Sequence, residues 1–198
     1  AFQQIIPAAF AAVIFPAFSF YYATSKELLG KTFLKAIRYL TIVSFPLAAG
    51  LIVLVKPIIA TFWPAYEGII PTFIVMSLAI PFIFLAFPTG YLLNACNRQN
   101  NTTFNRGIIT ALAVILNVAL IPIYSYYGSG IAFLITNVVL LFLDFIWVKK
   151  IISIDFKEIG LIIFKTLAAT GVMIIVILTL INQFQLLILG PIGAVVYF

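Results

Sequence analysis

Long apolar segments alternate with short polar links along the whole chain. The apolar segments cover residues 5–23, 41–60, 71–95, 107–124 and 131–148, a sixth that ends near 181, and an incomplete seventh from about 186. About 20 residues at about 1.5 Å each can cross the roughly 30 Å hydrocarbon core of a bilayer. The segments lack the two-residue alternation of a membrane β-barrel. The pattern therefore predicts an all-α, polytopic membrane helical bundle of about seven spans.

The stretch 24–40 has a different pattern. Thr24 and Glu27 have the spacing of a capping box, which marks a helix start. Four basic residues are set against five apolar ones at helical spacing: Lys26, Lys31, Lys35 and Arg38 against Leu28, Leu29, Phe33, Ile37 and Leu40. This pattern predicts an amphipathic helix that lies on a membrane face. The alternative is a helical extension of the span that follows.

The polar links differ in charge. The link CNRQNNTTFNR, residues 96–106, carries two arginines and is expected to lie in water, whereas the turn at 126–130 carries no basic residue. The links after the first, third and fifth spans hold the basic residues apart from Lys56, and Lys165 can extend to the same surface. By the positive-inside rule these links are cytoplasmic and Ala1 is outside.

Composition supports a membrane protein and argues against an enzyme. Hydrophobic residues make up 65% of the chain and charged residues 8%, too little polar surface to cover a soluble globule. The net charge of +6 fits membrane topology and anionic lipid headgroups, and gives no support for nucleic-acid binding. Histidine is absent and Cys96 is the single cysteine, which removes His-based metal sites and Ser-His or Cys-His catalysis. We expect no cofactor.

Polar side chains inside the spans are the candidate functional residues, because each is unfavourable in hydrocarbon. Lys56 could bind an anionic group of a substrate, or could simply extend to the interface. Asp144 could be an ion-coupling carboxylate, or could pair with a base at the cytoplasmic edge. Asn117 and Asn137 could contact substrate, but more often such amides join helices. Gln4 could contact sugar hydroxyls or mark the outer end of its helix.

Several stretches resemble the polysaccharide and O-antigen flippases of the multidrug, oligosaccharidyl-lipid and polysaccharide exporter superfamily. ILNVALIPIYSYYGSGIAF resembles that family's pattern of Asn, Ile-Pro and a Gly-containing turn, and LLNACNRQNN resembles its preceding polar turn. VIFPAFS and SFPLAAGLIVLVKPII are similar to two further family stretches. The resemblance covers most of the chain, in the expected order.

The resemblance implies a transporter of two lobes that flips lipid-linked oligosaccharide or polysaccharide precursors by alternating access. Residues 1–150 would be the second-lobe bundle and residues 151–198 additional C-terminal helices. Its partners would be membrane lipids, the lipid-linked glycan and a first lobe of the same protein, in a prokaryotic plasma membrane. The alternatives are a multidrug extruder or lipid II flippase of the same superfamily, a membrane scaffold subunit, and an intramembrane transferase, which the lack of His disfavours.

Single cysteines introduced after replacement of Cys96 test the topology. A reagent that does not cross the membrane should react from outside with a cysteine at Ser129 and spare one at Asn101, because only the link at 96–106 carries arginine. The opposite labelling pattern would overturn the orientation.

Overall fold

A computed structural model describes residues 4–180 and 197, and the regular structure of this part is helical. Its elements are α1 (Ile5–Thr24), α2 (Lys26–Phe62), the 3₁₀ segment η2 (Pro64–Ile69), α3 (Ile70–Leu78), α4 (Ile80–Ala95), α5 (Gln99–Tyr124), α6 (Tyr126–Val148) and α7 (Phe156–Leu180). Six helical segments are long and apolar enough to span a membrane, and η2, α3 and α4 together form one of them. The all-α membrane bundle is confirmed; the expected seventh span lies outside the described residues.

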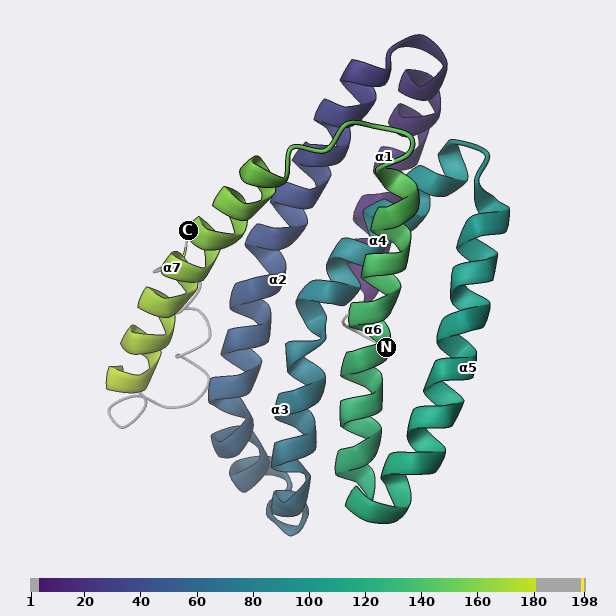
Figure 1. Ribbon diagram of the computed structural model, residues 1–198. Coiled ribbons are helices and arrows are strands. Elements are labelled where there is room, and N and C mark those ends of the chain that lie inside the picture. The colour runs from purple at the N-terminus through teal and green to yellow at the C-terminus, as the bar shows by residue number, and fades with distance from the viewer. Residues whose placement is uncertain (1–3, 181–196, 198) are drawn as a thin grey trace.

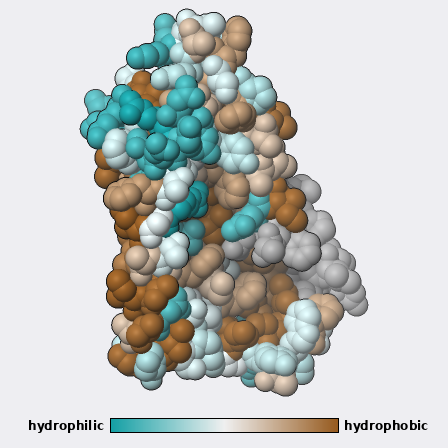
Figure 2. Space-filling view, turned by 90° about the vertical axis from the view of Figure 1, so that its right-hand side faces the viewer, coloured by the Kyte–Doolittle hydropathy of each residue, from teal (hydrophilic) through white to brown (hydrophobic). Residues whose placement is uncertain are grey.

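Consecutive long helices alternate in direction and form an up-and-down bundle. Figure 1 shows α7, α2, α3, α6 and α5 side by side in that order, with α1 behind them, and α4 packs against α1, α2 and α6. The links at 25, 96–98 and 149–155 share one end, which we call the basic end. Hydrophilic residues gather at this end, at the top of Figure 2. The opposite end, which we call the aromatic end, holds η2 and the α5–α6 turn, with Trp63 and Tyr126 exposed.

The amphipathic stretch 24–40 is not a separate helix on the membrane face. Residues 26–40 form the beginning of α2, a continuous helix of 37 residues, as in the alternative interpretation. Leu29, Phe33 and Ile37 are buried in the main core with Phe18 of α1 and Phe84 of α4. The pattern is amphipathic because one side of α2 is covered by neighbouring helices while its basic side stays exposed.

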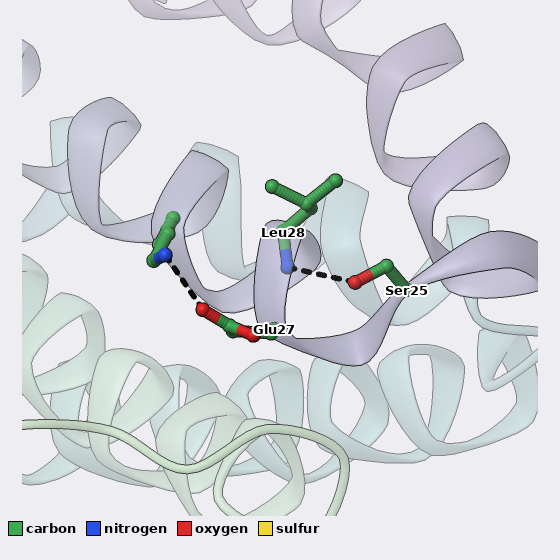
Figure 3. Close-up of polar contacts among 4 residues, drawn as sticks. Ser25, Glu27 and Leu28 are labelled. Atoms are coloured by element: carbon green, nitrogen blue, oxygen red, sulfur yellow. Dashed lines mark hydrogen bonds and ion pairs between the residues drawn. The ribbon is translucent and has the colours of Figure 1, made fainter.

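The start of α2 also differs from the expected capping box. Ser25, rather than Thr24, is the N-cap, and its hydroxyl accepts a hydrogen bond from the Leu28 backbone N–H at 3.3 Å (Figure 3). The Thr24 hydroxyl instead donates to the Phe20 carbonyl of α1 at 2.9 Å. Glu27 accepts from Lys31 one turn later, at 2.6 Å. The sequence pattern therefore predicted the N-cap one residue too early.

Two links are shorter than the pattern predicts. Because α5 begins at Gln99, only residues 96–98 form the link, and the rest of CNRQNNTTFNR is helical. Asn97 makes the turn with φ 57°. Likewise α6 begins at Tyr126, so the α5–α6 turn is Ser125 alone, with φ 53°. Residues 126–130, expected as a turn, are the first turns of α6.

Gly128 and Gly130 are both buried in the first turns of α6. A methyl group at Gly128 would stand 2.5 Å from the Leu120 carbonyl oxygen, closer than non-bonded atoms approach. A methyl group at Gly130 would stand 3.1 Å from the Thr72 methyl carbon. Gly128 therefore lets α5 and α6 approach closely, while Gly130 faces α3.

Gly128→Ala should destabilise the protein by about 1–3 kcal/mol, because the new methyl group pushes against backbone that cannot move aside. A fall in melting temperature in detergent would show this. Gly107→Ala is the matched control on α5, since nothing lies within 4 Å of its new methyl group. Equal melting temperatures for the two variants would contradict the packing role of Gly128.

Candidate functional site

Three helices bring a small polar cluster together inside the bundle. Asn105 of α5 is 1% exposed and Asp144 of α6 is 0% exposed. The Asn105 amide Nδ2 donates a hydrogen bond to Asp144 Oδ1 at 2.8 Å. The second carboxyl oxygen, Oδ2, has no hydrogen-bond partner among the described residues. The hydrogen bond that holds this buried carboxyl group thus comes from one neutral amide.

The helix boundaries explain why these two residues meet. Asn105 lies about 9 Å below the start of α5, and Asp144 about 6 Å before the end of α6. Since α5 and α6 are consecutive antiparallel helices, both residues are at a similar depth near the basic end. Asn105 is the buried residue of α5, whose other described side chains are at least partly exposed. The Asn105–Asp144 bond is therefore the main polar tie between the basic end of α5 and the bundle.

Two further residues surround the carboxyl group. Thr89 of α4 is fully buried beside it, and its hydroxyl donates to the Ala86 carbonyl at 2.9 Å. Arg106 follows Asn105 on α5 and is exposed. Its Nη2 lies 3.6 Å from where a methyl group on Gly90 would stand, so Gly90 leaves space for the guanidinium against α4.

The structure decides between the two sequence-based explanations of Asp144 only in part. An ion pair with a base at the cytoplasmic edge is not among the ion pairs of the described residues, which join Lys31 to Glu27 and Arg38 to Glu158. The hydrogen-bond partner is instead an amide. The ion-coupling role of Asp144 stays a prediction.

Asn117 and Asn137 are half-buried and bond within their own helices. Asn117 Nδ2 donates to the Ala113 carbonyl at 2.7 Å, and Asn137 Nδ2 donates to the Phe133 carbonyl at 2.8 Å. Neither of these bonds crosses between helices, contrary to the expectation that these amides tie adjacent spans. Their contact with substrate stays a prediction.

Lys56 and Gln4 are both exposed. Lys56 lies in the last turns of α2, toward the aromatic end, and Gln4 immediately precedes α1. Asp144 lies toward the basic end, so the bundle does not gather the predicted residues into one site. Substrate contact by Lys56 and Gln4 stays a prediction.

Cys96, in the link after α4, is buried, at 1% exposure. Burial raises the pKa of its thiol to about 11, against the opposing effect of the positive charges of Arg98 and Lys26. A thiol that stays protonated near neutral pH is a poor nucleophile. Cys96 therefore has no evident chemical role.

Two cavities open on either side of α2 and α7. A cavity of about 500 Å³ has charged residues in its lining and contains the ion pair between Arg38 Nη2 and Glu158 Oε1, at 2.7 Å, together with Lys165. A second, of about 370 Å³, is lined largely by apolar side chains such as Phe82, Phe145 and Phe156. The first, with its charged lining, could receive a polar group at the basic end.

The sequence-based site omits Asn105, Arg106 and Thr89. Asn105 and Arg106 were assigned to an aqueous link because they stand in a run of Asn, Gln and Thr. A hairpin that turns at Ser125 places residues 106 and 144 at equal distances from the turn, but the sequence pattern did not locate that turn. A carboxyl group buried in one arm needs a polar partner, and the other arm offers one at that depth.

A double-mutant cycle on Asn105→Ala and Asp144→Ala measures the strength of the buried tie. Each single change leaves a buried polar group unpaired, and the coupling free energy should be about 1 kcal/mol, toward the upper range for hydrogen bonds in membranes. The half-exposed pair Arg38 and Glu158 is the control, with a coupling below about 0.5 kcal/mol. Unfolding in detergent supplies the free energies. A buried coupling no larger than the control would show that the bond contributes little.

Comparisons with known proteins show which family and which solved structure the chain resembles. Residues 1–66 match the family described as polysaccharide biosynthesis protein. No curated protein sequence matches the chain. Its structure is similar to that of the lipid II flippase MurJ in an inward closed conformation, with a TM-score of 0.76 and 19% identity; the match covers 98% of this chain and 43% of the flippase. The chain thus spans less than half the length of that protein. It has the fold of part of that flippase. Its residues 1–66, which include the stretches VIFPAFS and SFPLAAGLIVLVKPII, match the polysaccharide biosynthesis family, in agreement with the resemblance of these two stretches.

Proposed function

We propose that this chain is one lobe of a membrane carrier that flips lipid-linked oligosaccharide or polysaccharide precursors across the bilayer by alternating access. The observation that carries this proposal is the fold match, which takes in nearly the whole chain but only 43% of the flippase. The family match at residues 1–66 supports a precursor used in polysaccharide biosynthesis. The remaining lobe of the carrier would be its principal partner.

The physics of the substrate explains why such a carrier is needed. A lipid pyrophosphate bearing a glycan does not cross unaided, since removing an anion from water is highly unfavourable. The carrier supplies a polar path while the lipid tail stays in the bilayer. A two-lobe carrier contributes one wall of the path from each lobe, so this chain forms at most one wall. The process makes and breaks no covalent bond, in keeping with a transporter rather than an enzyme.

Within this wall we propose distinct roles for the polar residues. Lys56 is exposed and charged, so it can contact an anionic headgroup without first breaking an ion pair among the described contacts. Gln4 is exposed and can contact sugar hydroxyls. Asn117 and Asn137 can offer substrate their carbonyl oxygens, since their amide nitrogens already donate to backbone. Asp144 would couple transport to an ion.

The membrane orientation belongs to the same proposal. The chain is a multi-pass membrane protein, and we place the basic end in the cytoplasm of a prokaryotic cell and Ala1 outside. Basic residues at one end and aromatic residues at the other support this orientation. A lipid II flippase is the second candidate function, favoured by the identity of the structural match. A polar groove between the lobes would distinguish either flippase from an apolar drug extruder and from a scaffold.

Deletion of the gene for the complete protein should trap lipid-linked glycan on the cytoplasmic leaflet, measured by the leaflet distribution of a labelled glycolipid. The complete protein should restore export. This chain expressed alone should not, because it provides one wall only. Normal export in a strain that contains no second flippase would reject the assignment, and lipid II accumulating in place of a longer glycan would favour the second candidate.

A further inference from the structure

The Asp144 carboxyl group is held in a way that suits a neutral acid. It is fully buried and accepts one hydrogen bond from an uncharged amide. An ionised carboxylate removed from water needs a cation or several hydrogen-bond donors, and Oδ2 has no partner among the described residues. A protonated carboxyl group avoids the buried charge.

A cation lies one residue away on α5. Arg106 follows Asn105, and its guanidinium rests against α4 in the space that Gly90 leaves. Arg106 belongs to neither of the ion pairs formed by the described residues. One residue along a helix corresponds to a rotation of about 100°. A rotation of α5, or a swing of the side chain, would therefore replace the amide of Asn105 by the guanidinium of Arg106 opposite Asp144.

The surroundings of α5 permit this exchange. The most apolar stretch of α5 contains no buried residue. Among the described elements, α5 packs against α6 and, to a lesser extent, against α4. Among the described elements, α6 packs mainly against α5, α4 and α3. On α5 the charged group is Arg106, on α4 the titratable side chain is Tyr91, whose ring packs against Phe15 of α1, and α3 has neither kind.

We propose that Asp144 is a proton-binding switch that pairs with Asn105 when protonated and with Arg106 when ionised, and that the exchange repositions the basic end of α5. The link between this exchange and transport rests on the proposed function, whereas the exchange itself does not. In the structure Asp144 pairs with Asn105, so the structure corresponds to the protonated state.

Two spectroscopic measurements on the complete purified protein test the switch without any transport assay. Infrared spectra should show a carboxylic-acid C=O band that is lost as the pH rises. Asp144→Asn should remove this band, and Asp155→Asn, at an exposed carboxyl group, should leave it unchanged. Spin labels at the exposed positions Thr103 and Ile146 should report a change in the α5–α6 distance over the same pH range.

Variants distinguish the protonation of Asp144 from its pairing with Arg106. Asp144→Asn should hold the distance at its low-pH value, because the new side chain stays neutral. Arg106→Gln should abolish the distance change while a titrating band remains. Gly90→Leu should displace the guanidinium from its resting place and shift both titrations toward lower pH, because the cation then favours the ionised acid. Gly107→Ala, whose methyl group meets nothing within 4 Å, should change neither measurement.

Two results would overturn the switch directly: the absence of a C=O band assignable to Asp144, or a change in the α5–α6 distance that persists in Arg106→Gln. A third is a midpoint of the band titration that moves when Na⁺ replaces choline at constant ionic strength, because this would indicate a metal cation site. If the switch holds while deletion of the gene leaves glycolipid export normal, the proposed function fails and the switch remains. If export fails in the deletion strain while the band is absent, the flippase assignment remains and the switch is rejected.

Discussion

Hydrocarbon offers no hydrogen-bond partner, so every polar group within the membrane must find one inside the protein. This constraint accounts for the helical architecture and for the local bonds of the polar side chains. The hydroxyls of Thr41 and Thr136 donate to carbonyls four residues earlier, and the amides of Asn117 and Asn137 do the same. Such residues are compatible with lipid because they complete their bonding within one helix.

Asp144 does not meet the constraint in that way, because the hydrogen bond of its carboxyl group joins it to a neighbouring helix rather than to the backbone of α6. It needs a donor from a neighbouring helix, and Asn105 supplies it. The same bond fixes the basic end of α5, a helix with little other burial. A single polar contact thus has two effects, on the bonding of one carboxyl group and on the position of a whole span.

The distribution of charge along the bundle fits a protein that holds a fixed orientation in a membrane. Basic side chains gather at one end, where they remain solvated, and the long α2 carries its cations on the first turns only, apart from Lys56. Its apolar side at the same level is covered by α1, α4 and α6. The described part of the bundle therefore has a charged end that can stay in water and an apolar middle that can lie in hydrocarbon (Figure 2).

The sequence by itself determined the class, the approximate positions of the spans and the asymmetry of charge, because apolar length and the positions of lysine and arginine are local properties of the chain. It did not determine where the spans begin and end: residues 99–106 and 126–130 were assigned to links, although helices continue through polar residues whose backbone bonds are satisfied. Nor did it show that 24–40 packs into the core, since an amphipathic pattern looks the same whether its apolar side meets lipid or other helices. The pairing of Asn105 with Asp144 was decided by tertiary structure alone, because it depends on the exact turn at Ser125 and on the rotation of α5 about its axis. A one-residue rotation would have presented Arg106 instead, and local sequence does not specify that angle.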